Sequence, residues 1–383
     1  MNTFLTGIQL ARQREFREFV ARHVTPEAAA WDRAQAIPPA TIQRMAAAGY
    51  LGSTLPEKVG GQGWDAVTYG LLNEAVGRGS ASLTDLLTIQ AMVSMTVLKW
   101  GSAEQKSRWL PPLARGEIIG AFALTEPTGG SDLQSLQTQF TESGDGSYRL
   151  NGRKTWISYG QSAGVFLIIG YADKVPVACL LPRETAGLSI EPITGMMGYR
   201  AAGLASLVFN DVAVPAASLV GKPGTALNYI APIGLQWGRI STACSALGLL
   251  RACFEESTAR AASRKVRDGT VGNFGMTRSL LARMGTDLEA TGLLCLAACR
   301  ATDEHLPEAF TKVLMAKYFA SQAAVRAASD AVQIWGAAGC HEDAPVSRYY
   351  RDAKILEIIE GTTQIHEELL GKAFVHAASK SVA

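Results

Sequence analysis

The chain changes character at Ala121-Phe-Ala-Leu-Thr-Glu-Pro-Thr-Gly-Gly-Ser-Asp132. An apolar strand ends at Leu124, and the glycines that follow let backbone amides approach a ligand closely. Thr125 and Ser131 add hydroxyl groups, and Asp132 can hold the loop by capping. Taken alone, the same residues also fit an ordinary glycine-rich turn. The stretch therefore predicts the start of a β region together with a candidate binding loop.

Helical patterns lie on both sides of this β region. Amphipathic Ala-rich segments predict helices at 11–23, 40–48, 65–77 and 84–100. Short β-branched or aromatic runs predict strands at 148–150, 154–157, 165–169, 175–181 and 207–209. Long helical patterns follow at 230–264, 277–302, 308–335 and 355–379. Successive blocks argue against a doubly wound sheet. We expect an α+β, mostly α, protein with helical domains at 1–118 and 223–383 and a β domain at 119–222.

The composition excludes several classes of protein. Of 383 residues, 48% are hydrophobic and 18% charged, which excludes a disordered chain. The formal net charge of +2 gives no electrostatic case for a nucleic-acid or membrane-surface binder. The first residues lack the apolar core of a signal peptide. No stretch approaches the roughly 20 apolar residues that span a bilayer, and the best apolar run is Ile240–Leu250. We expect a cytoplasmic protein.

Six cysteines, at positions 179, 244, 253, 295, 299 and 340, lie mostly in apolar helical context. Cys295 and Cys299 share one helix face, but no histidine or second cysteine pair accompanies them at zinc spacing. We expect reduced core residues and no metal site.

Two further polar clusters carry possible chemistry. Lys154-Thr-Trp-Ile-Ser158 sets a large aromatic residue beside polar groups on a strand, although this Trp would suit ordinary sheet packing equally well. In Tyr350-Arg-Asp-Ala-Lys-Ile-Leu-Glu-Ile-Ile-Glu-Gly-Thr-Thr-Gln-Ile365, a helix ends at Glu360, between two isoleucines and Gly361. A carboxylate beside apolar residues has a raised pKa, as a general base near neutrality needs. The alternative is a surface glutamate before a C-cap glycine.

Together these clusters resemble the acyl-CoA dehydrogenase family over nearly the whole chain. Four motifs match in order: Leu124-Thr-Glu-Pro-Thr-Gly-Gly-Ser-Asp132, Trp156-Ile-Ser158, Asp330-Ala-Val-Gln-Ile-Trp-Gly336, and Arg351-Asp-Ala-Lys through Glu360-Gly-Thr362. Each motif is moderately specific, and their joint spacing is highly specific. The resemblance implies a helical domain, a small β-barrel and a C-terminal four-helix bundle, with FAD as cofactor and an acyl thioester as substrate.

The resemblance assigns the flavin to the interface of the β domain and the C-terminal bundle. The residues matching positions near the flavin or its adenosine part are Phe122, Leu124, Thr125, Ser131, Trp156, Ser158, Thr362 and Gln364. Arg264, Gln333 and Gly336 match a segment that reaches the FAD of a neighbouring subunit, which implies a homodimer or homotetramer. Arg267 and Gly275 replace an aromatic residue and a hydrogen-bonding glutamine of the family pattern, so we expect a looser cross-subunit contact.

Glu360 matches the family's catalytic base, which removes the α-proton while a hydride leaves the β-carbon for flavin N5. Its backbone amide would stabilise the enolate-like charge on the thioester. Some members carry the base directly before the residue matching Arg239, but Gly238 stands there and cannot act. Positions matching substrate contacts are Thr88, Gln90, Met92, Arg239 and Gly361.

Softer cues resemble the branch that acts on carrier-protein thioesters in polyketide extender-unit synthesis, of the methoxymalonyl or hydroxymalonyl type. They are Thr88-Ile-Gln-Ala-Met92, Gly198-Tyr-Arg-Ala-Ala-Gly203 and Glu357-Ile-Ile-Glu360. The alternative is a conventional short-chain acyl-CoA dehydrogenase that passes electrons to an electron-transfer flavoprotein, and reoxidation by oxygen would make the protein an oxidase. A DNA-binding flavoprotein of the damage response is disfavoured by the small net charge.

Overall fold

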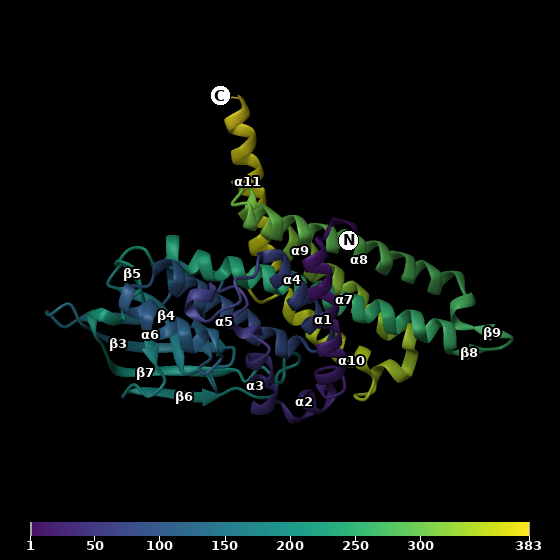
Figure 1. Cartoon of the computed structure of the whole chain (residues 1–383), viewed down its shortest axis with the longest axis horizontal. Coiled ribbons are helices and arrows are strands. Elements are labelled where there is room, and N and C mark those ends of the chain that lie inside the picture. Colours follow the sequence, from purple (N-terminus) through teal and green to yellow (C-terminus); the bar gives the residue numbers. More distant parts are fainter. Residues whose placement is uncertain (1, 383) are drawn as a thin grey trace.

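The computed structural model describes residues 2–382, and side chains from 3 to 379. A helical region, a β region and a second helical region follow one another, as the sequence predicts (Figure 1). The predicted domain boundaries at 118/119 and 222/223 fall in connections between elements and stay predictions. The outer ends of the predicted domains, residues 1 and 383, lie outside the described residues.

Six α-helices form the N-terminal region: α1 (Gly7–His23), α2 (Ala28–Ala34), α3 (Pro39–Ala47), α4 (Ala66–Gly79), α5 (Ala81–Trp100) and α6 (Ala103–Ala114). Short 3-10 turns lie at Asn2–Phe4, Tyr50–Gly52 and Glu57–Val59. Side-chain caps at Thr6, Asp65, Ser80 and Ser102 accept backbone N–H groups and set where four of these helices begin. The sequence predicts neither α2, which has only 7 residues, nor α6, which contains two consecutive prolines.

Helix α5 corrects the expectation that no stretch is long enough to span a membrane. By length and composition it qualifies, but 89% of its most apolar window is buried inside the protein. It packs against α4, α6, the long C-terminal helix α7 (Ala231–Ser263) and strand β1 (Gly120–Ala123). These neighbours make α5 a core helix of the folded chain.

Seven strands form the sheet of the β region: β1, β2 (Gln139–Glu142), β3 (Tyr148–Ile157), β4 (Val165–Ala172), β5 (Val175–Pro182), β6 (Leu188–Pro192) and β7 (Ala205–Val214). The neighbour order is β1-β4-β2-β3-β7-β6, and β5 pairs with β4. The predicted strands 148–150 and 154–157 are one strand, because a register shift after Leu150 bends β3 without ending it. Strands β2 and β6 were missed because they are largely exposed and lack an apolar pattern.

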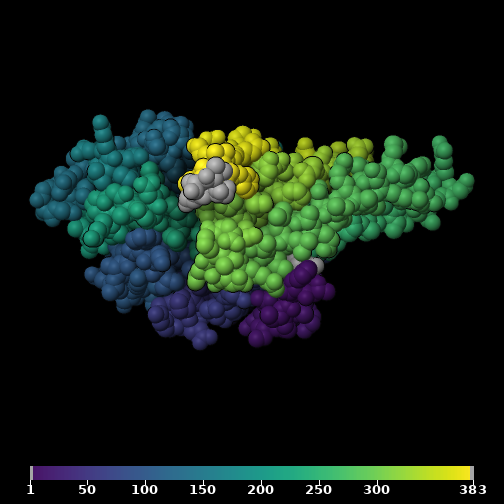
Figure 2. Space-filling view, turned by 90° about the horizontal axis from the view of Figure 1, so that it is seen from above, coloured from purple at the N-terminus to yellow at the C-terminus, as the bar shows by residue number. Residues whose placement is uncertain are grey.

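The C-terminal region contains α7, α8 (Gly275–Asp303), α9 (Ala309–Trp335), α10 (Pro345–Leu356) and α11 (Thr363–Val382), with a small hairpin of β8 (Lys265–Val266) and β9 (Gly269–Thr270). Short turns lie at Leu133–Ser135, Ala216–Ser218, Ala226–Ile230, Val271–Asn273 and Gly336–Cys340. The predicted helix 355–379 is two helices, because the chain turns between α10 and α11. The hairpin end forms a narrow projection, opposite the sheet along the long axis (Figures 1 and 2).

One hydrophobic core joins the two helical regions, and α7 lies at its centre. Helix α7 packs against α4 and α5 on one side and α8 and α9 on the other. All six cysteines are free thiols, and Cys340 is exposed, which corrects its expected place in the core. Within residues 2–382, no group of three or more His, Cys, Asp or Glu side chains is arranged to hold a metal ion.

Candidate active site

The turn between α10 and α11 carries Glu360 in an unusual conformation. Its φ is 55°, in the left-handed region, and Gly361 follows with φ 99°. Because a non-glycine residue is strained there, surrounding contacts must hold it. Arg239 Nε on α7 donates to the Glu360 carbonyl oxygen at 3.1 Å, and Lys317 Nζ on α9 donates to the Gly361 carbonyl oxygen at 2.6 Å. Two buried basic side chains therefore fix the turn.

The Glu360 carboxylate is enclosed between α5 and α7. Its Oε2 atom is buried and has no hydrogen-bond partner among the described residues. A Cβ at Gly238 would lie only 2.3 Å from Oε2 and 2.9 Å from Met92 Sδ, so the carboxylate rests directly on this glycine. Burial raises the pKa of Glu360 to about 7, against the opposing charge of Arg239 and with a further contribution from the Asp85 carboxylate. The geometry and charge suit a base that works near neutral pH.

Lys317 is a site residue that sequence reasoning missed. Its side chain is fully buried, and burial lowers its pKa to about 7. Val313, Ala320 and Ala324, which lie on the same face of α9, are also buried. A lysine on an otherwise apolar helix face is the signal that would have found it.

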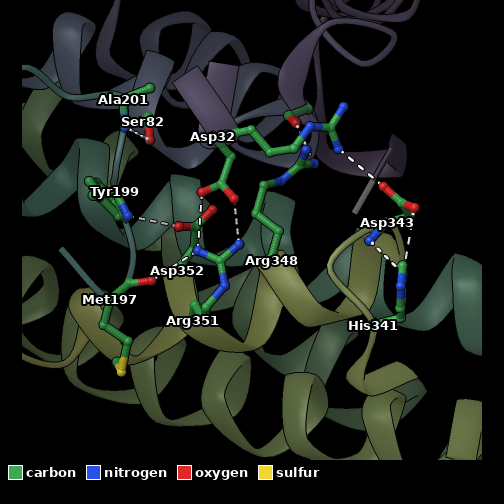
Figure 3. A network of polar contacts seen from close by, with 12 residues as sticks. Asp32, Ser82, Met197, Tyr199, Ala201, His341, Asp343, Arg348, Arg351 and Asp352 are labelled. Atoms are coloured by element: carbon green, nitrogen blue, oxygen red, sulfur yellow. Dashed lines mark hydrogen bonds and ion pairs between the residues drawn. The ribbon is translucent and has the colours of Figure 1, made fainter. Parts of the chain in front are cut away.

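Helix α10, which leads to the Glu360–Gly361 turn, is anchored to both other regions (Figure 3). The Arg351 guanidinium donates to the Asp32 carboxylate of α2 at 3.1 and 2.5 Å, and to a main-chain carbonyl in the β6–β7 connection at 2.9 Å. The Asp352 carboxylate accepts the N–H of Tyr199 in the same connection at 2.8 Å. Bidentate Arg–carboxylate pairs fix orientation as well as distance. These contacts position Glu360 from outside its own turn.

The glycine-rich loop after β1 is held by a buried ion pair. Lys154 Nζ on β3 lies 2.7 Å from Glu126 Oε1 and donates to the Leu124 carbonyl oxygen at 2.9 Å. The same carboxylate accepts the N–H groups of Gln137 and Thr138 at 2.5 and 2.9 Å. These bonds fix both ends of the loop against β3, so its remaining groups are presented in one arrangement.

The residues around this loop fit a flavin ring. The N–H groups of Thr125 and Ser131 have no hydrogen-bond acceptor among the described residues. Trp156 has φ 59° and an exposed fraction of 53%, so its aromatic face is uncovered. Phe122 packs on Gly234 of α7, beside the loop. Free amide donors suit the carbonyl groups of an isoalloxazine, and an open aromatic face suits its ring system.

Ser158 and the start of α11 complete the predicted flavin set. The Ser158 side chain lies beside the buried Asp85 carboxylate of α5, where it lowers the pKa of Asp85 against the larger effect of burial, which raises that pKa to about 6. Thr362 directly precedes α11, and its hydroxyl accepts the N–H of Ile365 at 3.4 Å in the manner of an N-cap. Gln364 is exposed on the first turn. Their contacts with the cofactor stay predictions.

The predicted cross-subunit residues lie far from the Glu360–Gly361 turn. Arg264 follows α7, 26 positions after Gly238, which corresponds to about 39 Å along a helix. Gln333 and Gly336 are at the end of α9, and all three predicted contacts are exposed. The single chain does not bring them to Trp156, so their contact with a neighbouring subunit's FAD stays a prediction. Of the two departures from the family pattern, Arg267 (φ 50°) lies between β8 and β9, and Gly275 begins α8.

The three predicted substrate contacts on α5 separate in the structure. Met92 lies beside Gly238, next to the Glu360 carboxylate. Thr88 Oγ1 lies 2.6 Å from Ser241 Oγ of α7. Gln90 is fully buried and faces elsewhere: its amide donates to two main-chain carbonyls at 2.7 and 3.1 Å and accepts the N–H of Gly120 at 3.0 Å. Gln90 therefore ties β1 to α5, contrary to the expectation from sequence, and is left out of the acyl pocket proposed below.

Comparison with known proteins decides the family. Models of the N-terminal, middle and C-terminal domains of acyl-CoA dehydrogenase match residues 7–117, 121–212 and 228–375. The chain belongs to the acyl-CoA dehydrogenase family. This acyl-CoA dehydrogenase is 35% identical to the mitochondrial short-chain specific acyl-CoA dehydrogenase of Mus musculus over 364 residues, which are 93% of this chain and 87% of that protein.

Solved structures support the same assignment. Butyryl-CoA dehydrogenase from Megasphaera elsdenii matches with a TM-score of 0.93 and 31% identity, covering 97% of this chain and 99% of that one. The prolyl acyl carrier protein oxidase AnaB matches at 0.91 and 26%, covering 97% and 99%. FkbI, for biosynthesis of the methoxymalonyl extender unit of Fk520, matches at 0.85 and 28%, covering 95% and 99%. The protein is an FAD-dependent oxidoreductase that acts on acyl thioesters.

Proposed function

We propose that this acyl-CoA dehydrogenase oxidises a small polar acyl group carried as a thioester on an acyl carrier protein, in polyketide or other secondary metabolism. The observation that carries the proposal is the buried hydroxyl pair of Thr88 and Ser241, which lies on the same α5–α7 seam as the catalytic carboxylate. A hydroxyl oxygen on this seam can accept a further hydrogen bond from a polar acyl group, and an alkyl chain has no donor to offer it. The likeness to AnaB and FkbI supports the carrier-protein thioester.

In the proposed reaction Glu360 is the base. Bound FAD supplies the hydride acceptor for the β-carbon. The thioester carbonyl acidifies the α-proton, which the Glu360 carboxylate removes. The N–H of Glu360 has no hydrogen-bond acceptor among the described residues, so it is free to donate to the thioester oxygen as negative charge develops there. Arg239 and Lys317 act as positioning residues, because they hold the carbonyl groups of the turn that carries both the base and this donor.

The rate of flavin reduction is expected to rise with pH and level off above about 7. The working form of Glu360 is the carboxylate, and burial raises its pKa to about 7, so protonation removes the base as the pH falls. Arg239 and Lys317 face the carboxylate as basic groups and Asp85 faces it as an acid, and burial lowers the pKa of Lys317 to about 7, so Lys317 loses its proton in the same pH range. Stopped-flow measurements across pH 5–9 check this, and Asp85→Asn should move the midpoint downward. A rate that is flat between pH 5 and 8 contradicts the assignment.

Conventional short-chain acyl-CoA oxidation is the second candidate function. It is favoured by the 35% identity to the mouse short-chain enzyme. In either case we propose a cytoplasmic enzyme whose flavin is reoxidised by an electron-transfer flavoprotein or by oxygen. We also propose a homodimer or homotetramer, since Met276 and Leu293 on α8 and Phe374 and Val375 on α11 are exposed apolar residues.

Flavin bleaching by different thioesters separates the two candidates. A small hydroxyacyl group on a carrier protein should reduce the flavin at least about tenfold faster than butyryl-CoA or octanoyl-CoA, a difference of about 1.4 kcal/mol. The same hydroxyacyl group on CoA is the control that isolates the carrier. Faster bleaching by butyryl-CoA or octanoyl-CoA would assign the protein to ordinary acyl-CoA catabolism.

A further inference from the structure

The α5–α7 seam continues past the catalytic carboxylate as a layer of hydroxyl groups. On α7, Ser241 lies three residues after Gly238, and on α5, Thr88 lies four residues before Met92. Both steps are one helical turn on the same face. The two hydroxyl oxygens are 2.6 Å apart, and both side chains are buried. This contact joins the helices about 5 Å beyond the carboxylate and closes the seam there.

The direction of the hydrogen bonds in this layer is fixed by Asn73 of α4. Its Nδ2 donates to the main-chain carbonyl of Tyr69 at 2.8 Å, and a carbonyl can only accept, so Asn73 Oδ1 must face the other way. Ser241 Oγ lies 2.6 Å from this Oδ1 and must donate to it. The proton between Thr88 and Ser241 therefore comes from Thr88. The chain of donation runs from Thr88 to Ser241 to Asn73.

Each hydroxyl group of the layer thus donates its proton to an acceptor within the protein, so none is left to donate to a ligand. The remaining hydroxyl, that of Tyr69, donates to the main-chain carbonyl of Leu87 at 3.1 Å. The second contact of Thr88, with the Thr84 carbonyl oxygen at 3.1 Å, also needs the single Thr88 proton as donor. No described group donates a hydrogen bond to Thr88 Oγ1. Thr88 Oγ1 therefore keeps its lone pairs available as acceptors at the end of the donation chain.

We propose that Thr88 Oγ1 accepts a hydrogen bond from a hydroxyl group near the end of a short acyl chain, and that the Thr88–Ser241 contact sets the length limit of that chain. The proposal rests on the proposed function and names its substrate class: short hydroxyacyl thioesters with the hydroxyl beyond the reacting carbons. An alkyl chain of equal length fills the same space but has no donor to offer. A site built to accept a substrate hydroxyl discriminates against the analogue that lacks it.

Two matched pairs of probes test the proposal: 4-hydroxybutyryl-CoA with pentanoyl-CoA, and 5-hydroxypentanoyl-CoA with hexanoyl-CoA. Each pair differs by one hydroxyl in place of one methyl. Binding is measured by calorimetry on the FAD-loaded Glu360→Gln variant, which should bind thioesters without turning them over. We expect the hydroxyacyl probe of at least one pair to bind about tenfold or more tightly. Equal binding within both pairs would overturn the proposal.

Variants of Thr88 show whether Thr88 Oγ1 causes the preference for the hydroxyacyl probes. Added to Glu360→Gln, Thr88→Val keeps the shape, removes the lone pairs and should abolish the preference, whereas Thr88→Ser should retain it. The matched control is Thr291→Val on α8, where a fully buried threonine donates only within its own helix, to the Asp287 carbonyl oxygen at 2.6 Å. It should leave the preference unchanged. Retention of the preference in Thr88→Val, with FAD content and fold intact, contradicts the proposal.

The result is separable from the proposed function. If no acyl thioester, on CoA or on a carrier protein, reduces the flavin of the wild-type protein, the proposed function fails whatever the binding ratios are. If thioesters do reduce the flavin but both members of each probe pair bind equally, the proposed chemistry stands and the assignment of Thr88 fails.

Discussion

Replacing Glu360 by glutamine is expected to slow flavin reduction by an acyl thioester at least about 10²-fold while FAD stays bound. The amide has the shape of the carboxylate but cannot take the α-proton. Folding should be retained, because glutamine has the shape of glutamate, Oε2 has no hydrogen-bond partner among the described residues, and Arg239 and Lys317 bond to main-chain carbonyl groups that the variant keeps. Stopped-flow reduction and the absorbance spectrum of the purified variant measure both effects.

Glu357 supplies the matched control for this experiment. It lies three residues earlier, and its half-buried carboxylate pairs with Lys354 at 2.6 Å instead of lying against Gly238. Glu357→Gln should therefore reduce its flavin at close to the wild-type rate. If Glu360→Gln also keeps the wild-type rate, Glu360 is not the base, and the other buried carboxylate of the pocket, Asp85, becomes the group to test.

The local part of the site could be predicted from the sequence. Glu360 follows two isoleucines and precedes Gly361, so its neighbours in the sequence indicate both the helix end and the apolar surroundings. The structure places a turn there and encloses the carboxylate. The loop at Thr125 and Ser131 is similar, because the glycines that shape it are its own neighbours. Short-range signals of this kind need no knowledge of the tertiary fold.

The partners of Glu360 could not be predicted in the same way. Arg239 and Lys317 come from α7 and α9, and they meet at the turn only because the helices pack side by side. The error at Gln90 has a related cause. Helix α5 is buried almost all round, so its periodicity does not show which face meets the catalytic carboxylate. Gln90 lies two positions after Thr88, which on a helix is enough to turn its side chain towards β1 instead.

For the fold too, features set by local sequence could be predicted and features set by tertiary packing could not. The order of helical and β blocks followed from local patterns, and the structure shows that order. Strands β2 and β6 could not be predicted from the sequence. An alternating apolar pattern arises where one face of a strand is buried, and most of the side chains of these two strands are exposed. Gly361 indicated where the helix ends. The length of the turn between α10 and α11 could not be predicted, because it depends on the buried side chains of Arg239 and Lys317 that hold it.

Gly238→Ala is expected to slow flavin reduction by about 10²-fold, although alanine is the mildest possible change on a helix. The added Cβ would lie 2.3 Å from Glu360 Oε2 and 2.6 Å from its Cδ, well inside contact distance. Because Arg239 and Lys317 hold the main chain of the turn, the side chain has to move instead. A displacement of about 1 Å in a reacting group is enough for a loss of this size.

The position of the base, and not the stability of α7, should account for the effect of Gly238→Ala. Alanine has a higher helix propensity than glycine, so the helix itself gains. Gly285→Ala on α8 is the control: the nearest atoms to its added Cβ are 3.5 Å away, in ordinary contact, and its rate should match the wild type. Thermal unfolding and FAD content are measured on both variants. A Gly238→Ala protein that is folded, yellow and fully active would contradict the prediction. It would show that the Glu360 carboxylate does not take the α-proton from its position against Gly238. Loss of activity with FAD retained would show that the absence of a side chain at 238 is what lets Glu360 occupy the catalytic position.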